Sequence, residues 1–158
     1  MSTTDVSGET SAASPDTLGV DMNLEAVTVP VSDVDRAKAF YESLGWRLDI
    51  DLKVSDDMRT VQFTPPHSGC SIHIGTGLTE MAPGSLDRVL LAVQDIEAAR
   101  ADLISRGVDV SEVSNRKPPG FDAPGDSYFL YASFTDPDGN GWLMQEITTR
   151  LPGRTWED

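Results

Sequence analysis

The sequence predicts an α+β fold built from two consecutive copies of one βαβββ module. A duplicated segment is the first reason, because the stretch 27–46 recurs about 62 residues later as 89–108 without a gap. The second reason is that in each copy an alternating apolar run ends at an aspartate, and a pattern of helical period follows. The copies share residues at Val27 and Val89, Val31 and Val93, Asp33 and Asp95, Ala37 and Ala99, Ala39 and Ala101, Ser43 and Ser105, and Gly45 and Gly107.

Each copy begins as a strand followed by a capped helix of about three turns. Asp33 and Asp95 stand where a helix N-cap belongs, because a carboxylate there accepts hydrogen bonds from the free N–H groups of the first turn. Gly45 and Gly107 are expected to end the helices in the left-handed conformation. The apolar stripes that should face the core are Val34, Ala37, Tyr41 and Leu44 in the first helix and Ile96, Ala99, Leu103 and, less regularly, Ile104 in the second.

Three further strands are expected in each module. In the first module they span 46–54, 58–64 and 70–75, and the apolar and charged residues of 46–54 alternate as in a strand with one face in water. In the second module they span 108–113, 127–135 and 141–148. The last two are joined by a turn at 136–140, whose Pro and Gly supply the dihedral angles of a turn. Segment 114–126 is rich in turn residues, and we expect a long functional or mobile loop there, with a lid as one interpretation.

The chain is long enough for one domain that buries a real core. We expect a disordered acidic tail at 1–21, a single domain at 22–150 with modules at about 22–77 and 85–150, and a C-terminal tail at 151–158. Residues 76–84 form the linker between the modules.

Composition excludes some classes of partner. The formal net charge of −14 and the pI near 4.3 argue against a nucleic-acid-binding protein, because phosphate would be repelled from most of the surface, and anionic membranes are disfavoured for the same reason. The single cysteine, Cys70, cannot form an intramolecular disulfide, and no apolar run suits a signal peptide or a membrane span. The expected location is the cytoplasm.

The segment 30–46 and the motif at 136–141, Asp-Pro-Asp-Gly-Asn-Gly, together resemble the vicinal oxygen chelate superfamily. This is the family of glyoxalase I, bleomycin resistance proteins and extradiol dioxygenases, and the resemblance runs from about 23 to about 149. It implies that each module curls its sheet into half a barrel, so that a pair of half-barrels encloses a concave cavity. It does not imply a particular reaction, because one fold hosts several chemistries.

Metalloenzymes of this family hold a divalent ion with side chains from the first and last strands of the modules. Those positions fall on Ala26, His73, Arg88 and Leu143, of which only His73 can bind a metal. A slip of the last strand would bring in Glu146, although an odd-numbered slip requires a bulge. A charged guanidinium would repel a dication. The sequence therefore predicts no metal cofactor, with a divalent metal at His73 and Glu146 as the weaker alternative.

The same positions supply the candidate ligand-binding residues. His73 is either a cavity-lining imidazole or a satisfied strand histidine, and Arg88 either binds an anionic group beside His73 or forms a salt bridge with Asp87 or another acid. Phe134 and Trp142 belong to an aromatic cluster of which some rings should pack under the helices and others line the cavity. The predicted ligand-binding residues are Thr28, His73, Arg88, Leu90, Tyr128, Leu143 and Gln145, with Arg116 and Lys117 as possible helpers.

Two functions fit these residues. The first is a metal-free protein that binds a small aromatic or planar molecule, an anionic one included, as a homodimer in the cytoplasm. The second is a lyase, isomerase or dioxygenase that uses either a metal or acid–base chemistry, with His73 as the catalytic base and Arg88 as the catalytic residue that holds an oxyanion. The sequence leaves open whether the cavity forms within one chain or between two.

Overall fold

The computed structural model describes residues 8–9, 19–121 and 125–151. Most of the two expected tails, and residues 122–124 of the expected loop, lie outside the described residues. Neither of the two helices in the described part of the chain has the length and apolar character of a transmembrane segment.

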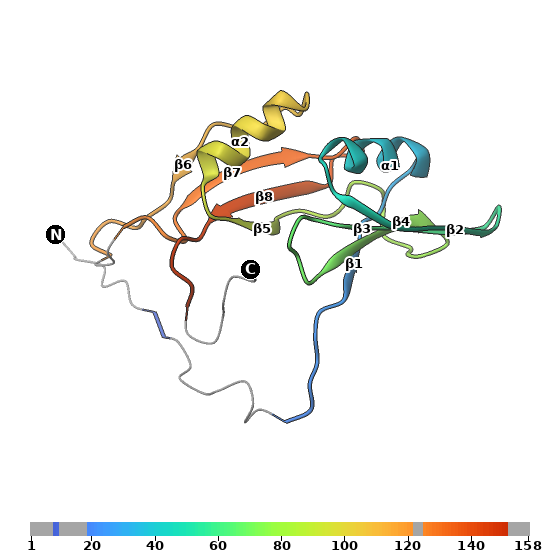
Figure 1. The fold of residues 1–158 in the computed structure, drawn as a ribbon, viewed down its shortest axis with the longest axis horizontal. Coiled ribbons are helices and arrows are strands. Elements are labelled where there is room, and N and C mark those ends of the chain that lie inside the picture. The colour runs from blue at the N-terminus through green and yellow to red at the C-terminus, as the bar shows by residue number, and fades with distance from the viewer. Residues whose placement is uncertain (1–7, 10–18, 122–124, 152–158) are drawn as a thin grey trace.

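The predicted tandem βαβββ order is confirmed (Figure 1). The two sheets have the strand orders β1-β4-β3-β2 and β5-β8-β7-β6, in which β1 is parallel to β4, β5 is parallel to β8 and all other pairs are antiparallel. The elements are β1 (Ala26–Thr28), α1 (Val34–Ser43), β2 (Arg47–Ser55), β3 (Met58–Thr64), β4 (Ser71–Thr76), β5 (Val89–Val93), α2 (Ile96–Ser105), β6 (Ser114–Asn115), β7 (Leu130–Thr135) and β8 (Gly141–Glu146).

The caps that were predicted from the sequence are present. Asp33 accepts a hydrogen bond of 3.0 Å from the backbone N–H of Arg36, and Asp95 accepts one of the same length from Ala98. Gly45 and Gly107 follow the last helical turns with φ angles of 79° and 85°, a region that glycine enters without the steric penalty of a Cβ.

Two strand predictions in the second module were wrong. Segment 108–113 forms no strand: the backbone N–H of Ser111 donates to the carbonyl of Ser133, but the N–H of Ser133 donates to the hydroxyl of Ser111 and not to a backbone carbonyl, so the ladder is not completed. Strand β7 begins at Leu130 and not at 127, because Tyr128 has a φ angle of +74°, which a strand cannot accommodate.

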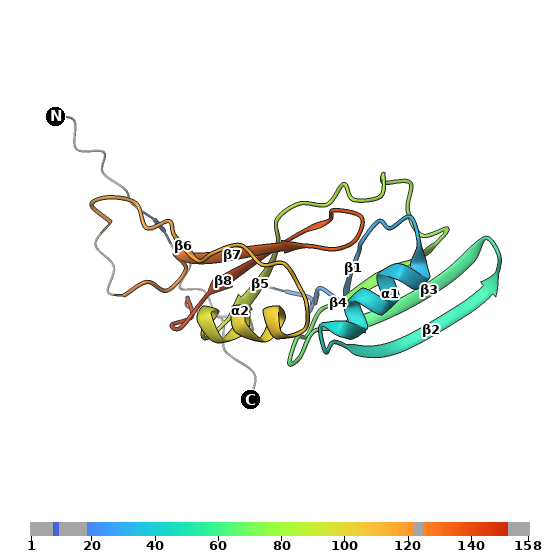
Figure 2. The ribbon, with the colours of Figure 1, turned by 90° about the horizontal axis from the view of Figure 1, so that it is seen from above.

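Both helices lie on the same side of the two sheets, which sit side by side (Figures 1 and 2). The core fills the space between the helices and the sheets, and its fully buried members include Tyr41, Phe63, Ile74, Ile96 and Met144. No described helix or strand covers the opposite sides of the sheets. We call these the open face of the first sheet and the open face of the second sheet.

The apolar side of β2 lies on the open face, which the sequence did not reveal. Asp51 forms ion pairs with Lys38 of α1 and with Arg59, at 3.0 and 2.8 Å, so the charged side of the strand points towards the helix. Ile50 and Leu52 pair with Gln62 and Thr60 of β3, which alternate with the buried Val61 and Phe63. The strand is exposed along its whole length. Its apolar side is therefore left uncovered in a single chain.

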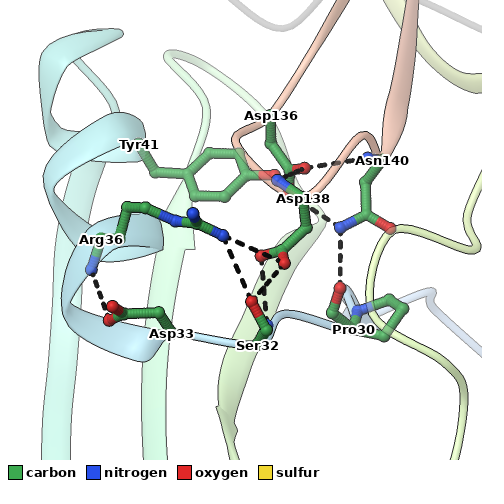
Figure 3. Close-up of polar contacts among 8 residues, drawn as sticks. All are labelled: Pro30, Ser32, Asp33, Arg36, Tyr41, Asp136, Asp138 and Asn140. Atoms are coloured by element: carbon green, nitrogen blue, oxygen red, sulfur yellow. Dashed lines mark hydrogen bonds and ion pairs between the residues drawn. The ribbon is translucent and has the colours of Figure 1, made fainter.

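A buried polar cluster joins the two modules (Figure 3). The turn at 136–140 supplies Asp136, whose carboxylate accepts hydrogen bonds from the hydroxyl of Tyr41 at 2.9 Å and from the side-chain amide of Asn140 at 2.8 Å. The same amide donates to the carbonyl of Pro30 at 2.8 Å. Burial, reinforced by the neighbouring Asp136 charge, raises the pKa of Tyr41 far above its ordinary value, so this hydroxyl remains a donor.

A second set of contacts lies at the edge of this cluster. The hydroxyl and the backbone N–H of Ser32 both donate to the carboxylate of Asp138, at 2.5 and 3.1 Å, and Arg36 forms an ion pair with it at 3.2 Å. Burial opposes the ionisation of Asp138, but the hydrogen bonds from Ser32 outweigh it and hold the pKa of the carboxyl below its usual range. These contacts fix the first module against the second.

Candidate functional site

A hollow of about 490 Å³ lies on the open face of the second sheet. Strand alternation produces it, because Ala132, Phe134 and Met144 point towards α2 and are buried, while Ser133 and Leu143 point the other way. Its polar and charged lining comes from Asp87, Arg88, Asp109, Ser111, Arg116, Ser133 and Thr135. Arg88 and Leu143, two of the predicted ligand-binding residues, share this hollow.

The guanidinium of Arg88 forms no ion pair or hydrogen bond with any residue that the structure describes. The salt bridge to Asp87 that the sequence allowed is not formed, although Asp87 lines the same hollow. Arg88 also has a φ angle of +58°, which a residue with a Cβ adopts only at a cost in conformational energy. An unpaired cation on strained backbone, in a chain with a net charge of −14, suits an anionic group of a ligand.

Arg116 brings a second positive charge to the hollow. Its guanidinium carbon lies 4.7 Å from the centroid of the Tyr131 ring, within the range of a cation–π interaction. The hydroxyl of Tyr131 accepts a hydrogen bond of 2.8 Å from the side-chain amide of Gln145, which confirms that Gln145 shares the open face with Leu143. The hollow therefore contains two cations, Arg88 and Arg116, together with two carboxylates, Asp87 and Asp109.

Two other predicted residues lie at the margin of the hollow. Leu90 pairs with Leu143 across β5 and β8 and is 52% exposed. Tyr128 contributes its backbone carbonyl to Gln145 at 3.0 Å, but its hydroxyl accepts the backbone N–H of Leu151, and the ring does not line the hollow. Lys117 donates to the carbonyl of Gly125, which bridges two ends of the expected loop.

His73 lies on the open face of the first sheet, opposite in direction to the buried Ile72 and Ile74. Its Nε2 atom is 2.8 Å from Oε1 of Gln62, and Nε2 of Gln62 is 2.9 Å from a carboxylate oxygen of Asp49. Thr28 pairs with His73 on the neighbouring strand and lines a separate hollow of about 290 Å³ beside the linker. Asp49 and Gln62 were not recognised from the sequence, because neither belongs to a motif.

The expectation that Arg88 lies beside His73 was wrong within one chain. His73 does not line the hollow that contains Arg88, because the two open faces lie next to each other instead of facing each other.

The residues present do not fit a divalent metal. Glu146 accepts the backbone N–H of Ile96 at 3.0 Å, so it caps α2 on the side of the sheet that faces the helix, and the slipped register that would join it to His73 is contradicted. No group of three or more His, Cys, Asp or Glu side chains in the described ranges could hold a metal ion. Ala26, Arg88 and Leu143 supply no metal-binding atom at the remaining family positions.

Phe134 and Trp142 pack in the core, with exposed fractions of 3% and 2%, and both also contribute to the lining of the hollow. Burial, together with the charge of Glu25, raises the pKa of the Cys70 thiol, so this residue is a weak nucleophile.

Comparisons with known proteins agree with this architecture. The family model described as Glyoxalase/Bleomycin resistance protein/Dioxygenase superfamily matches residues 23–144. No curated protein matches the sequence.

Several solved structures share the fold. TnmS3, an antibiotic binding protein from Streptomyces sp. CB03234, is 31% identical, with a TM-score of 0.65 over 82% of this chain and 98% of TnmS3. A glyoxalase/bleomycin resistance protein from the same organism is 32% identical, with a TM-score of 0.61 over 78% of this chain and 99% of the other. A superfamily member from Sphaerobacter thermophilus is 29% identical, with a TM-score of 0.59 over 80% of this chain and 98% of its own.

Proposed function

The chain belongs to the glyoxalase/bleomycin resistance protein/dioxygenase superfamily, and on this premise we propose that it binds a small, planar, anionic organic molecule without a metal ion. The observation that carries the proposal is the unpaired guanidinium of Arg88 in the hollow of the second sheet. Arg88 is exposed to solvent and has no counter-ion among the described residues, so its guanidinium is free to form a charge-assisted hydrogen bond with an anionic ligand.

The shape and lining of the hollow support a planar ligand. Its volume falls within the range of small-molecule sites, and the planar guanidinium of Arg116, which lines the hollow and lies over the ring of Tyr131, offers a surface on which a flat ring can stack. The similarity to an antibiotic binding protein supports binding, as opposed to turnover, as the activity of this chain.

A homodimer completes the proposed site. The apolar side of β2 and β3 exposes Ile50, Leu52 and Met58 by 41–51%, and together they form an apolar surface that a monomer leaves in water. A second copy related by a two-fold axis would cover this surface and set the open face of one chain against that of the other. His73 of one copy could then face Arg88 of its partner.

Isothermal titration with 2-naphthoate, in the presence of a chelator, tests the binding proposal. We expect binding, and we expect Arg88→Ala to weaken it by roughly 10- to 100-fold, the value of a charge-assisted hydrogen bond. The neutral analogue 2-naphthamide should bind weakly to both proteins. Arg106→Ala is the control, because it removes an equal charge from the helical side. Equal affinity of Arg88→Ala and the unsubstituted chain for 2-naphthoate would overturn the proposal.

Sedimentation velocity tests the homodimer with a matched pair of variants. Ile50 on the open face and Ile104 on α2 are both 44% exposed. Ile50→Asp should produce monomers because it places a charge in the interface, whereas Ile104→Asp should leave the dimer intact. A monomeric unsubstituted chain at micromolar concentration, or the same result for both variants, would contradict the dimer.

A further inference from the structure

A chain of hydrogen bonds crosses the open face of the first sheet and ends at His73. Gln62 and His73 are directly opposite each other in the register of β3 and β4, so their side chains share this face. Asp49 joins them from β2 at an irregularity in the pairing between Leu48 and Ile50, which turns the carboxylate towards Gln62. Asp49 also accepts from Thr64 and from Arg47.

The ionisation of Asp49 determines, through Gln62, which nitrogen of the His73 ring carries a proton. The hydrogen bonds to Asp49, first of all the one from Thr64, lower the pKa of its carboxyl to about 2, so Asp49 is ionised at neutral pH and can only accept. The Gln62 atom that faces Asp49 must then be the amide nitrogen, and its carbonyl oxygen faces His73. A carbonyl oxygen can only accept, so Nε2 of His73 must carry a proton.

A neutral imidazole that is protonated at Nε2 has an unprotonated acceptor at Nδ1. Nδ1 of His73 receives no hydrogen bond from any residue that the structure describes. Across the sheet His73 is paired with Thr28 of β1 and Gln62 of β3, and the apolar Ile50 and Leu52 lie one strand further away on β2. The face thus presents one oriented acceptor at His73.

From this arrangement we propose that Asp49, Gln62 and His73 select a ligand that carries a hydroxyl or N–H donor on its planar ring system, which His73 binds through Nδ1. The inference rests on the proposed function and narrows the ligand to hydroxylated or amino-substituted planar anions. Asp49 and Gln62 act as positioning residues, because neither needs to touch the ligand.

Nitrogen-15 NMR of the imidazole rings tests the orientation without a ligand. The sequence has two histidines, so a His67→Ala variant leaves His73 as the single source of signal. We expect the tautomer protonated at Nε2 to dominate at neutral pH, and we expect Gln62→Leu to produce a mixture of both tautomers. A dominant Nδ1–H tautomer in the protein with Gln62 would overturn the inference.

Titration with 6-hydroxy-2-naphthoate and 6-methoxy-2-naphthoate tests the selection. The hydroxyl can donate to Nδ1 and the methoxy group cannot, so we expect about tenfold tighter binding of the hydroxy compound. His73→Leu and Gln62→Leu should abolish most of this preference. Thr60→Val changes a neighbouring side chain on the same face that takes no part in the hydrogen bonds from Asp49 through Gln62 to His73, and it should preserve the preference.

The outcomes separate this inference from the proposed function. Equal affinities for the two naphthoates would overturn the inference and leave anion binding intact. Binding of neither compound would overturn the proposed function and the inference with it. A preference for the hydroxy compound that survives Gln62→Leu would show that Asp49 and Gln62 do not position His73 for this selection.

Discussion

Substitution of Arg88 separates the backbone strain at this position from the role of its side chain. Arg88→Ala and Arg88→Gly both remove the guanidinium, so both should lose the affinity for 2-naphthoate to the same extent. They differ in whether residue 88 carries a Cβ at a φ angle of +58°. A difference in stability between the two variants therefore reports the backbone strain, reduced by the extra chain entropy that glycine loses on folding.

The magnitude follows from the conformational energies. The left-handed region costs a residue with a Cβ roughly 1–2 kcal/mol, and glycine avoids this cost but loses about 0.5–1 kcal/mol of additional chain entropy on folding. Arg88→Gly should thus be more stable than Arg88→Ala by about 1 kcal/mol. For a chain of this size that difference raises the melting temperature by roughly 2–4 °C.

Thermal unfolding followed by circular dichroism measures the difference, at one fixed protein concentration because the stability of the proposed dimer would depend on concentration. Arg106 provides the matched control: its φ angle is −90°, so at this position glycine should be less stable than alanine. The reasoning is refuted if Arg88→Ala is as stable as Arg88→Gly, or if the two pairs of variants show the same sign.

Three further predictions concern the module junction, acid stability and metals. Tyr41→Phe removes one hydrogen-bond donor to the buried Asp136 and one acceptor for Trp142. It should lower the free energy of unfolding in urea by about 1–3 kcal/mol. A loss below about 0.5 kcal/mol would contradict the stabilising role of this cluster between the modules. The lowered pKa of Asp49 contributes stability that is present above its unfolded value of 3.8 and is lost as pH falls towards 2. Asp49→Asn should reduce the change in unfolding free energy over this pH range, whereas Asp56→Asn, whose side chain is 97% exposed, should not. Identical pH dependence in the two variants would contradict the stabilising role of Asp49. Prolonged dialysis against chelator should leave the affinity for 2-naphthoate unchanged, and loss of binding that zinc or manganese restores would revive a metal site.

Much of the fold was predictable because its signals are local. Asp33 and Asp95 cap helices through N–H groups only three residues away, and the glycines after each helix adopt a conformation that their own lack of a Cβ permits. The failures in the second module were also local in cause: the positive φ angle of Tyr128 and the side-chain bond of Ser111 interrupt segments whose composition suits a strand.

The candidate site was predictable only in part. Strand alternation correctly placed His73, Leu143 and Gln145 on the sides of the sheets away from the helices. It could not reveal Asp49, whose position depends on an irregularity in strand pairing, or Gln62, which matters only because His73 lies opposite it across the sheet.

The sequence by itself determined the duplicated α+β module, its capped helices and the absence of metal-binding atoms at three of the four family positions, because each depends on residue type and near neighbours. The tertiary structure decided which side of each strand is covered. It turned the apolar side of β2 outwards, directed Glu146 to the N-terminus of α2 and placed Arg88 and His73 on separate open faces. These outcomes depend on how two modules pack through the buried contacts of Asp136 and Tyr41, which lie 95 residues apart in the chain, and no local pattern encodes that packing.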